Sequence, residues 1–60
     1  MKFISINAEG ENILLNLSSI LYLRSDRAKT LIHLTSGNII FTDEPIEELA
    51  RRLARMSDKF

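Results

Sequence analysis

The chain has 60 residues, 45% of them hydrophobic, no cysteine, and eight basic residues balanced by eight acidic ones. A chain of this length forms one small domain, which we place at residues 1–60, and without cysteine it cannot be stapled by disulfides. Zero net charge disfavours strong non-specific nucleic-acid binding, and the short apolar runs exclude a membrane-spanning helix. We therefore expect a cytoplasmic protein without membrane insertion.

The first part of the chain alternates apolar and polar residues in the way typical of strands. We expect a first strand at residues 2–6, a turn around Gly10 and a second strand at residues 12–17. In the second strand, Ile13, Leu15 and Leu17 fall on one face. The two serines that follow end the run, and residues 20–23 form a third strand that is apolar on both faces.

The stretch RSDRAKT, residues 24–30, separates two apolar runs. We interpret it as the loop between the third strand and a fourth at residues 30–34. A fifth strand follows at residues 38–42, joined to the fourth through Ser36-Gly37. Glycine supplies the positive φ that such hairpin turns need, so this is the clearest hairpin in the sequence.

The last part of the chain changes to a helical period. Apolar residues recur at intervals of three and four, which predicts a helix from about Pro45 to Met56. Thr42 or Asp43 can cap it, and the pairs Glu47–Arg51 and Glu48–Arg52 have the favourable i,i+4 order. The stripe facing the sheet is Ile46, Leu49, Ala50, Leu53 and Met56.

These elements predict an α+β fold, a four- to five-stranded antiparallel β-meander with one C-terminal α-helix. One helix cannot cover both faces of five strands, and an uncovered apolar face favours association. We therefore expect a homo-oligomer, a dimer or higher, or a protein partner. The expected interface consists of Ile20, Tyr22, Ile40 and Phe41.

The sequence shows no constellation typical of catalysis. His33 is the only histidine, and the spacing selects no nucleophile or carboxylate to act with it. The acidic run DEPIEE fits a helix N-terminus better than a cation site. We predict that the protein is not an enzyme and has no catalytic, cofactor-binding or metal-binding residue.

Basic residues provide the alternative function. Arg24, Arg27 and Lys29 lie in the stretch 24–30, and Arg55 lies near the end of the helix. As phosphate contacts they would make the chain a nucleic-acid-binding regulatory protein. A solvated turn and a solvated helix face account for them more simply, since Asp26 offsets one charge and Tyr22 is the only tyrosine available for base stacking.

Most of the chain, from NAEGEN to EELARRL, resembles the small flagellar-operon proteins of the FlbD type, which are linked to bacterial swarming motility. Their pattern is a glycine turn, an LN pair, an ITLxxG strand and turn, and an acidic segment before a short helix. RSDRAKT stands where those proteins have an acidic, proline-containing turn. The matching residues are Gly10, Leu15, Asn16, Ile20, Ile32, Leu34, Gly37, Glu47 and Glu48.

Two segments, LSSILYLRSD and EPIEELARRL, are also similar to a strand and a helix of LytTR-type DNA-binding domains. That resemblance implies DNA binding. From the residues and the first resemblance, we predict a small interaction module related to motility. The alternatives are a nucleic-acid-binding regulator and an uncharacterised small protein of phage or mobile-element origin.

Overall fold

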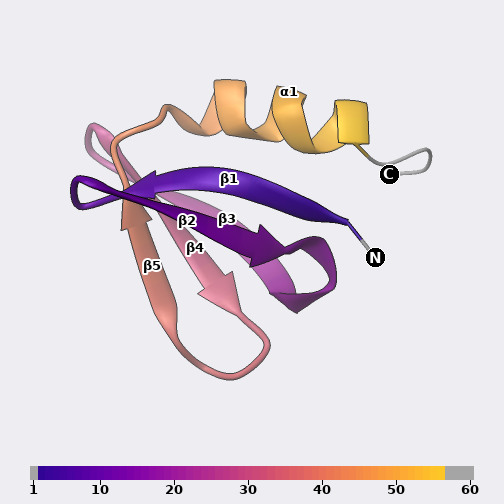
Figure 1. Ribbon diagram of the computed structural model, residues 1–60. Helices are drawn as coiled ribbons and strands as arrows, with labels where there is room; N and C mark the ends of the chain where they lie inside the picture. Colours follow the sequence, from indigo (N-terminus) through magenta and orange to yellow (C-terminus); the bar gives the residue numbers. More distant parts are fainter. Residues whose placement is uncertain (1, 57–60) are drawn as a thin grey trace.

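The computed structural model of the protein describes residues 2–56, which form five strands and one C-terminal helix (Figure 1). The predicted α+β meander is confirmed, with every strand antiparallel to its neighbour. A 3₁₀ turn at Leu17–Ser19 interrupts the strands where the two serines were expected to break them. The elements are β1 (Phe3–Ala8), β2 (Glu11–Asn16), β3 (Ile20–Asp26), β4 (Lys29–Leu34), β5 (Ile39–Thr42) and α1 (Ile46–Met56).

The strands divide into two sheets at the 3₁₀ turn. β1 and β2 form a hairpin, and the second sheet has the order β3–β4–β5, so β3 and β5 are its edge strands. In Figure 1 the helix lies above both sheets, and the β1–β2 hairpin crosses in front of the second sheet. The fold therefore encloses its core between the hairpin, the three-stranded sheet and the helix.

The core is a single cluster of aliphatic side chains from both sheets and the helix. As predicted, Leu49 and Leu53 of α1 are buried in it, and Ile13 and Leu17 pack beside Leu15. Ala50, expected on the same helical stripe, is exposed instead. The buried members of the cluster are Ile4, Ile6, Leu15, Ile32, Leu49 and Leu53.

The predicted turn at Ser36-Gly37 is confirmed. Gly37 has a φ of 100°, and its N–H donates to the carbonyl of Leu34 at 2.9 Å. The Leu34 N–H in turn donates to the carbonyl of Asn38 at 2.9 Å, which closes the β4–β5 hairpin. A positive φ is costly for any residue with a Cβ, so glycine is the residue that suits this position.

The interpretation of residues 24–30 as a loop is wrong. β3 continues to Asp26 and β4 begins at Lys29, with Asp26 opposite Lys29, so only Arg27 and Ala28 form the turn. Arg27 adopts a φ of 59°, a left-handed conformation that is unusual for arginine. Charged residues are tolerated here because this end of the hairpin is exposed to solvent.

The connection between β5 and α1 is held by hydrogen bonds at Glu44. The buried Thr30 hydroxyl donates to the Glu44 carbonyl at 2.7 Å, and the Glu44 N–H donates to the Thr42 hydroxyl at 3.2 Å. Arg52 Nη1 donates to Glu44 Oε1 at 2.6 Å, and its Nη2 donates to the Ser5 carbonyl. These contacts fix the helix against β1.

Two helix predictions need correction at this connection. Arg52 pairs with Glu44 and not with Glu48, because it turns toward β1, away from the solvent face. The Thr42 hydroxyl bonds the N–H of Glu44, in the turn before the helix, and the helix itself begins at Ile46 directly after Pro45.

Thr30→Val tests the Glu44 connection. The substitution keeps the side-chain volume but leaves the Glu44 carbonyl without its donor, and we expect a loss of about 1–2 kcal/mol of unfolding free energy. Urea denaturation followed by circular dichroism measures it. Thr35→Val is the matched control at an exposed position and should stay within about 0.5 kcal/mol. Equal stabilities of the two variants would contradict the role of the hydroxyl.

The β1–β2 turn provides a second stability test. Glu9 and Gly10 both have positive φ values, 52° and 83°, which is the pattern of a type I′ turn. Asparagine adopts this conformation more readily than glutamate, so Glu9→Asn should stabilise the protein by about 0.5–1 kcal/mol. A rise in the urea midpoint at constant slope would show it.

Gly10→Ala is the counterpart of that test. No atom lies within 4 Å of the position that a Cβ would take at Gly10, so any loss comes from backbone strain alone. We expect a loss of about 1 kcal/mol. Unchanged stability in both variants would show that the turn does not limit the stability of the hairpin.

Candidate functional site

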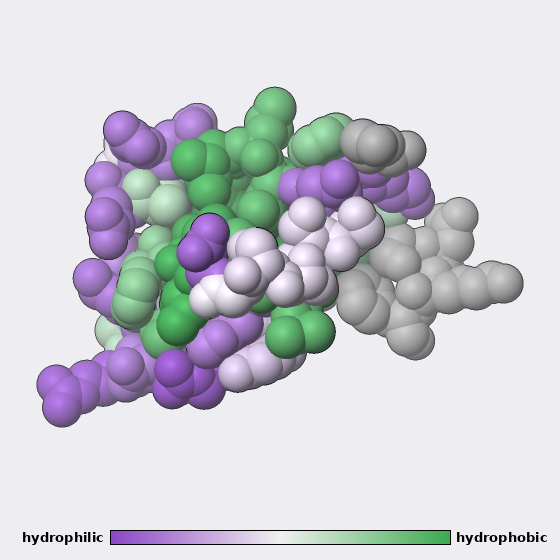
Figure 2. Space-filling view, turned by 90° about the horizontal axis from the view of Figure 1, so that it is seen from below, coloured by the Kyte–Doolittle hydropathy of each residue, from purple (hydrophilic) through white to green (hydrophobic). Residues whose placement is uncertain are grey.

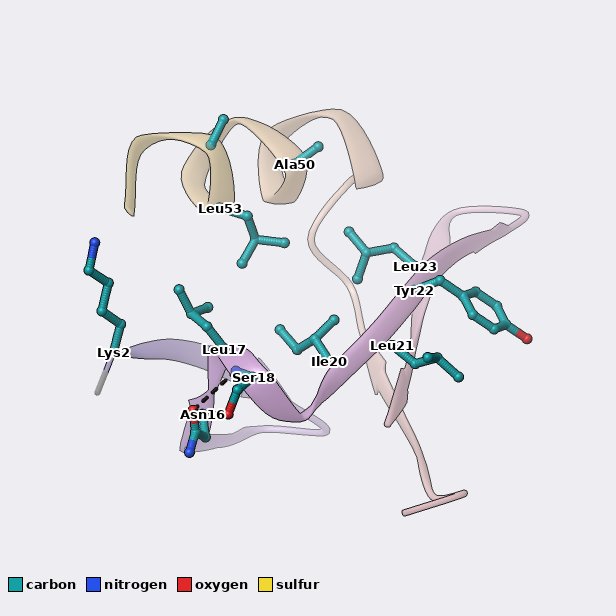
Figure 3. Close-up of a pocket in the computed structure, with 11 residues that line it drawn as sticks. Lys2, Asn16, Leu17, Ser18, Ile20, Leu21, Tyr22, Leu23, Ala50 and Leu53 are labelled. Carbon is teal, nitrogen blue, oxygen red and sulfur yellow. Dashed lines mark hydrogen bonds between the residues drawn. The ribbon is translucent and has the colours of Figure 1, made fainter. Parts of the chain in front are cut away.

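An apolar groove lies between α1 and β3 (Figure 3), and we call it the α1–β3 groove. Its volume is about 980 Å³. In Figure 3, Leu53 points down from the helix toward Leu17 and Ile20, and Leu23 points into the same space from β3. The lining residues are Lys2, Asn16, Leu17, Ser18, Ile20, Leu21, Tyr22, Leu23, Ala50, Leu53 and Ala54.

The groove stays open because the helix presents small side chains to β3. Leu49 and Leu53 face the core and are buried, whereas Ala50 and Ala54, one turn apart, face the strand and are exposed. A methyl group is too short to reach across to β3. Apolar atoms therefore line both walls with nothing between them among residues 2–56.

Three polar side chains at the rim of the groove, Lys2, Asn16 and Ser18, already have local partners. Lys2 Nζ donates to the Met56 carbonyl at 2.7 Å, at the C-terminal end of α1. The Asn16 side-chain oxygen accepts from the Ser18 N–H at 3.1 Å and from the Ser18 hydroxyl at 3.0 Å. The groove thus offers apolar surface and shape, with few polar atoms free to orient a small polar ligand.

A second surface lies on the opposite face of the three-stranded sheet. Tyr22 stacks on His33 with ring centroids 4.3 Å apart and planes 17° apart, and Arg24 Nε donates to His33 Nε2 at 3.3 Å. Phe41 and Ile39 of β5 are exposed by 41% and 42%. Figure 2, seen from the side away from the helix, shows apolar side chains gathered in a band between polar ones.

The structure divides the predicted interface between the two surfaces. Ile20 and Ile40 point inward and pack against the core, and Ile20 also lines the α1–β3 groove. Tyr22 and Phe41 are exposed by 50% and 41% on the outer face of the sheet, although the edge residue Tyr22 also reaches the rim of the groove. The four residues therefore do not form one surface.

The predicted basic contacts are also spread out. Arg24 lies on the outer face beside His33, and Arg27 occupies the tip of the β3–β4 turn. Lys29 Nζ is 3.9 Å from Asp43, and Arg55 is in the last turn of α1. Figure 1 shows the β3–β4 turn near the start of the helix, so Arg55 lies at the far end from the other three.

His33 is engaged with an aromatic ring and a guanidinium, and no described carboxylate hydrogen-bonds to it. Among residues 2–56 no three His, Cys, Asp or Glu side chains are grouped closely enough to hold a metal ion. Within the same residues, no helix has the length and apolar character required to cross a membrane.

Sequence reasoning did not identify the groove, although one signal was present. Ala50 directly follows Leu49 in the sequence, and Ala54 directly follows Leu53. On a helix these two small side chains lie along one side of the apolar stripe. The exposure of Leu21, at 60%, depends on a register shift between β3 and β4 that the sequence does not reveal.

Comparison with known proteins adds no assignment. The chain matches no family model, and no curated protein or solved structure is significantly similar to it.

Proposed function

We propose that the protein is a small non-enzymatic interaction module and that it works by closing its α1–β3 groove against another protein chain. The single observation that carries this proposal is the open apolar groove of about 980 Å³ beside the exposed edge of β3. Burial of apolar surface is favourable by about 25 cal/mol of free energy for each Å² removed from water.

The chemistry of the rim supports a protein chain over a small polar substrate. The polar side chains Lys2, Asn16 and Ser18 are already hydrogen-bonded within the chain, so they do not converge on a point inside the groove. A small-molecule site normally combines an apolar pocket with a few free polar groups that fix the ligand's orientation. A long open groove next to an unpaired strand edge is typical of peptide or protein recognition.

Chain length supports the same proposal. A 60-residue chain buries only about 60% of the surface that its unfolded form exposes, and chains near this size often gain stability from a partner. This chain has no cysteine and therefore no disulfide to supplement its core. Association through the groove would supply the missing apolar contacts.

Nucleic-acid binding is the second candidate, and the outer face of the sheet is the observation that favours it. Tyr22, His33 and Arg24 lie together there, and an aromatic ring beside a guanidinium can stack on a base. Asp26 and Asp43 offset the charge nearby, with Asp43 close to Lys29. The surface therefore lacks the excess positive charge that phosphate binding needs.

The resemblance to flagellar-operon proteins suggests a motility setting for the module. Two of the residues that carry the resemblance, Gly10 and Gly37, occupy turns with positive φ. Neighbouring genes that encode flagellar components would support this setting, whereas phage genes would favour the mobile-element alternative.

Ala54→Glu tests the groove directly. The substitution places a carboxylate on the groove wall at an exposed helical position, so it should leave the fold intact while making the groove polar. Two properties are measured for the parent and for Ala54→Glu. The first is the binding of an apolar fluorescent dye by dilute protein, and the second is association at high concentration, followed by sedimentation velocity. We expect Ala54→Glu to show at least several-fold weaker dye binding or association than the parent, in whichever of the two the parent shows.

Arg55→Ala is the matched control for this experiment. It changes the net charge by the same amount, and it removes an exposed residue that does not line the groove. The control should behave like the parent. If the parent neither binds the dye nor associates, or if both variants behave alike, the groove is not an interaction surface and the proposal is wrong.

The basic residues of the β3–β4 hairpin give an independent test of the second candidate. Because the hairpin's positive charge is largely offset, we expect no retention of labelled single-stranded RNA or DNA in a gel shift at low salt. Salt-sensitive binding that is lost on substituting Arg24, Arg27 and Lys29 together by alanine would instead establish the nucleic-acid function.

A further inference from the structure

One wall of the α1–β3 groove is a strand edge. β3 is the first strand of the order β3–β4–β5, so one of its edges is paired with β4 and the other faces away from the sheet. Among residues 2–56 no strand pairs with that outer edge. Unpaired backbone N–H and C=O groups on an exposed strand are a template for another strand.

We propose that the groove is occupied by a second copy of this chain, with the two β3 strands paired antiparallel about a two-fold axis at Leu23. This inference rests on the proposed function and names its partner. The two three-stranded sheets would join into one six-stranded sheet, with both helices on the same face. Each copy would cover the other's groove with its own Leu21 and Leu23.

Symmetry favours a second copy as the occupant. Two identical strands paired antiparallel are related by a two-fold axis, so one edge complements itself and the assembly closes as a dimer. Leu23 is the middle residue of β3, which runs from Ile20 to Asp26. An axis at Leu23 therefore places the whole of one β3 strand opposite the whole of the other.

The side chains of β3 fit the same register. With the axis at Leu23, Tyr22 of each copy lies opposite Arg24 of the other, and a ring beside a guanidinium gives two cation–π contacts. An axis at Arg24 would place two like charges directly opposite each other, which is destabilising. An axis at Tyr22 would shorten the paired segment to residues 20–24.

The β-bulge in β3 does not prevent this pairing. The register between β3 and β4 shifts between Ile20 and Tyr22, and Leu21 is the extra residue, exposed by 60%. Bulges disrupt regular pairing where they occur. This bulge lies at the start of the strand, and the segment from Tyr22 to Asp26 pairs one-to-one with β4. The central pairs about Leu23, which involve residues 22–24 of both copies, therefore avoid the bulge.

A dimer interface of standard size would take only part of the surface of this chain. A standard interface buries about 800 Å² on each partner, which is roughly a fifth of the 4408 Å² of accessible surface on this chain. The strand edge, the two apolar walls of the groove and the exposed Leu21 lie side by side and can contribute to one continuous interface. Ala50 and Ala54 leave room above the joined strands for the other copy's side chains.

Engineered thiols test the register, because the natural chain has no cysteine. Tyr22→Cys and Arg24→Cys are prepared separately, then mixed under mild oxidation. A disulfide needs Cα atoms about 4.4–6.8 Å apart, a distance that directly opposed residues of paired strands satisfy. We expect the mixture to form the linked heterodimer several-fold faster than either variant forms its own homodimer.

Leu14→Cys mixed with Arg24→Cys is the control, since Leu14 is 73% exposed on β2, away from the β3 edge. All three positions are exposed or half-exposed, so the variants should keep the parent's circular dichroism spectrum. Linking of the Tyr22 and Arg24 variants no faster than this control would overturn the inference. Slower linking when Ala54→Glu is added to both partners would support it.

The outcomes separate this inference from the proposed function. A monomeric parent that binds the apolar dye, with no preferential cross-link, overturns the second copy as partner and leaves the groove as a site for another protein. A parent that neither binds the dye nor associates, together with cysteine variants that show no preferential cross-link, overturns both. Preferential cross-linking together with a loss of association in Ala54→Glu supports both.

Discussion

The position of the helix depends on the hydrogen bonds around Glu44. Its backbone N–H and carbonyl bond the hydroxyls of Thr42 and Thr30, which are buried side by side in register on β5 and β4. Its carboxylate accepts from Arg52, which also reaches the Ser5 carbonyl on β1. A charge-assisted bond at a half-buried site is stronger than a neutral one, and here it joins three elements. The helix therefore enters at a fixed point and is tied to β1 through Arg52.

The way the helix packs determines where the apolar surface is left uncovered. With Arg52 held against β1, Leu49 and Leu53 fill the space over Ile4, Ile6 and Ile32, and the core closes there. On the flank toward β3, the helix carries Ala50 and Ala54 beside Leu53. The same contacts that complete the core on one side thus leave the groove open on the other.

The class of fold was predictable because it depends on periodicity. Alternation predicted the strands, Ser36-Gly37 predicted the β4–β5 hairpin, and the spacing of Leu49 and Leu53 predicted the buried helical face. The β3–β4 turn could not be found in this way, because Arg27 takes a left-handed conformation for which the sequence gives no glycine or asparagine signal. The charged residues in 24–30 suggested a loop. A solvent-exposed hairpin end can carry charged side chains while β3 and β4 remain paired.

The candidate site was harder to predict than the fold. Strands that are apolar on both faces do not show which residues face inward, so Ile20 and Ile40 could not be told from Tyr22 and Phe41 until the partner elements were known. The pairing of Arg52 with Glu44, eight residues away, depends on the path of the connection. Local spacing favours Glu48, and tertiary structure overrides that preference.

The contact between Lys2 and the Met56 carbonyl has a practical consequence for protein engineering. Residues 54 positions apart in sequence are hydrogen-bonded in space, and Lys2 also lines the α1–β3 groove. An affinity tag or fluorescent fusion attached next to either residue would therefore enter beside the groove mouth and compete with its occupant. The exposed β4–β5 turn at residues 35–38, at the opposite end of the sheet from the helix in Figure 1, is the better place for a label.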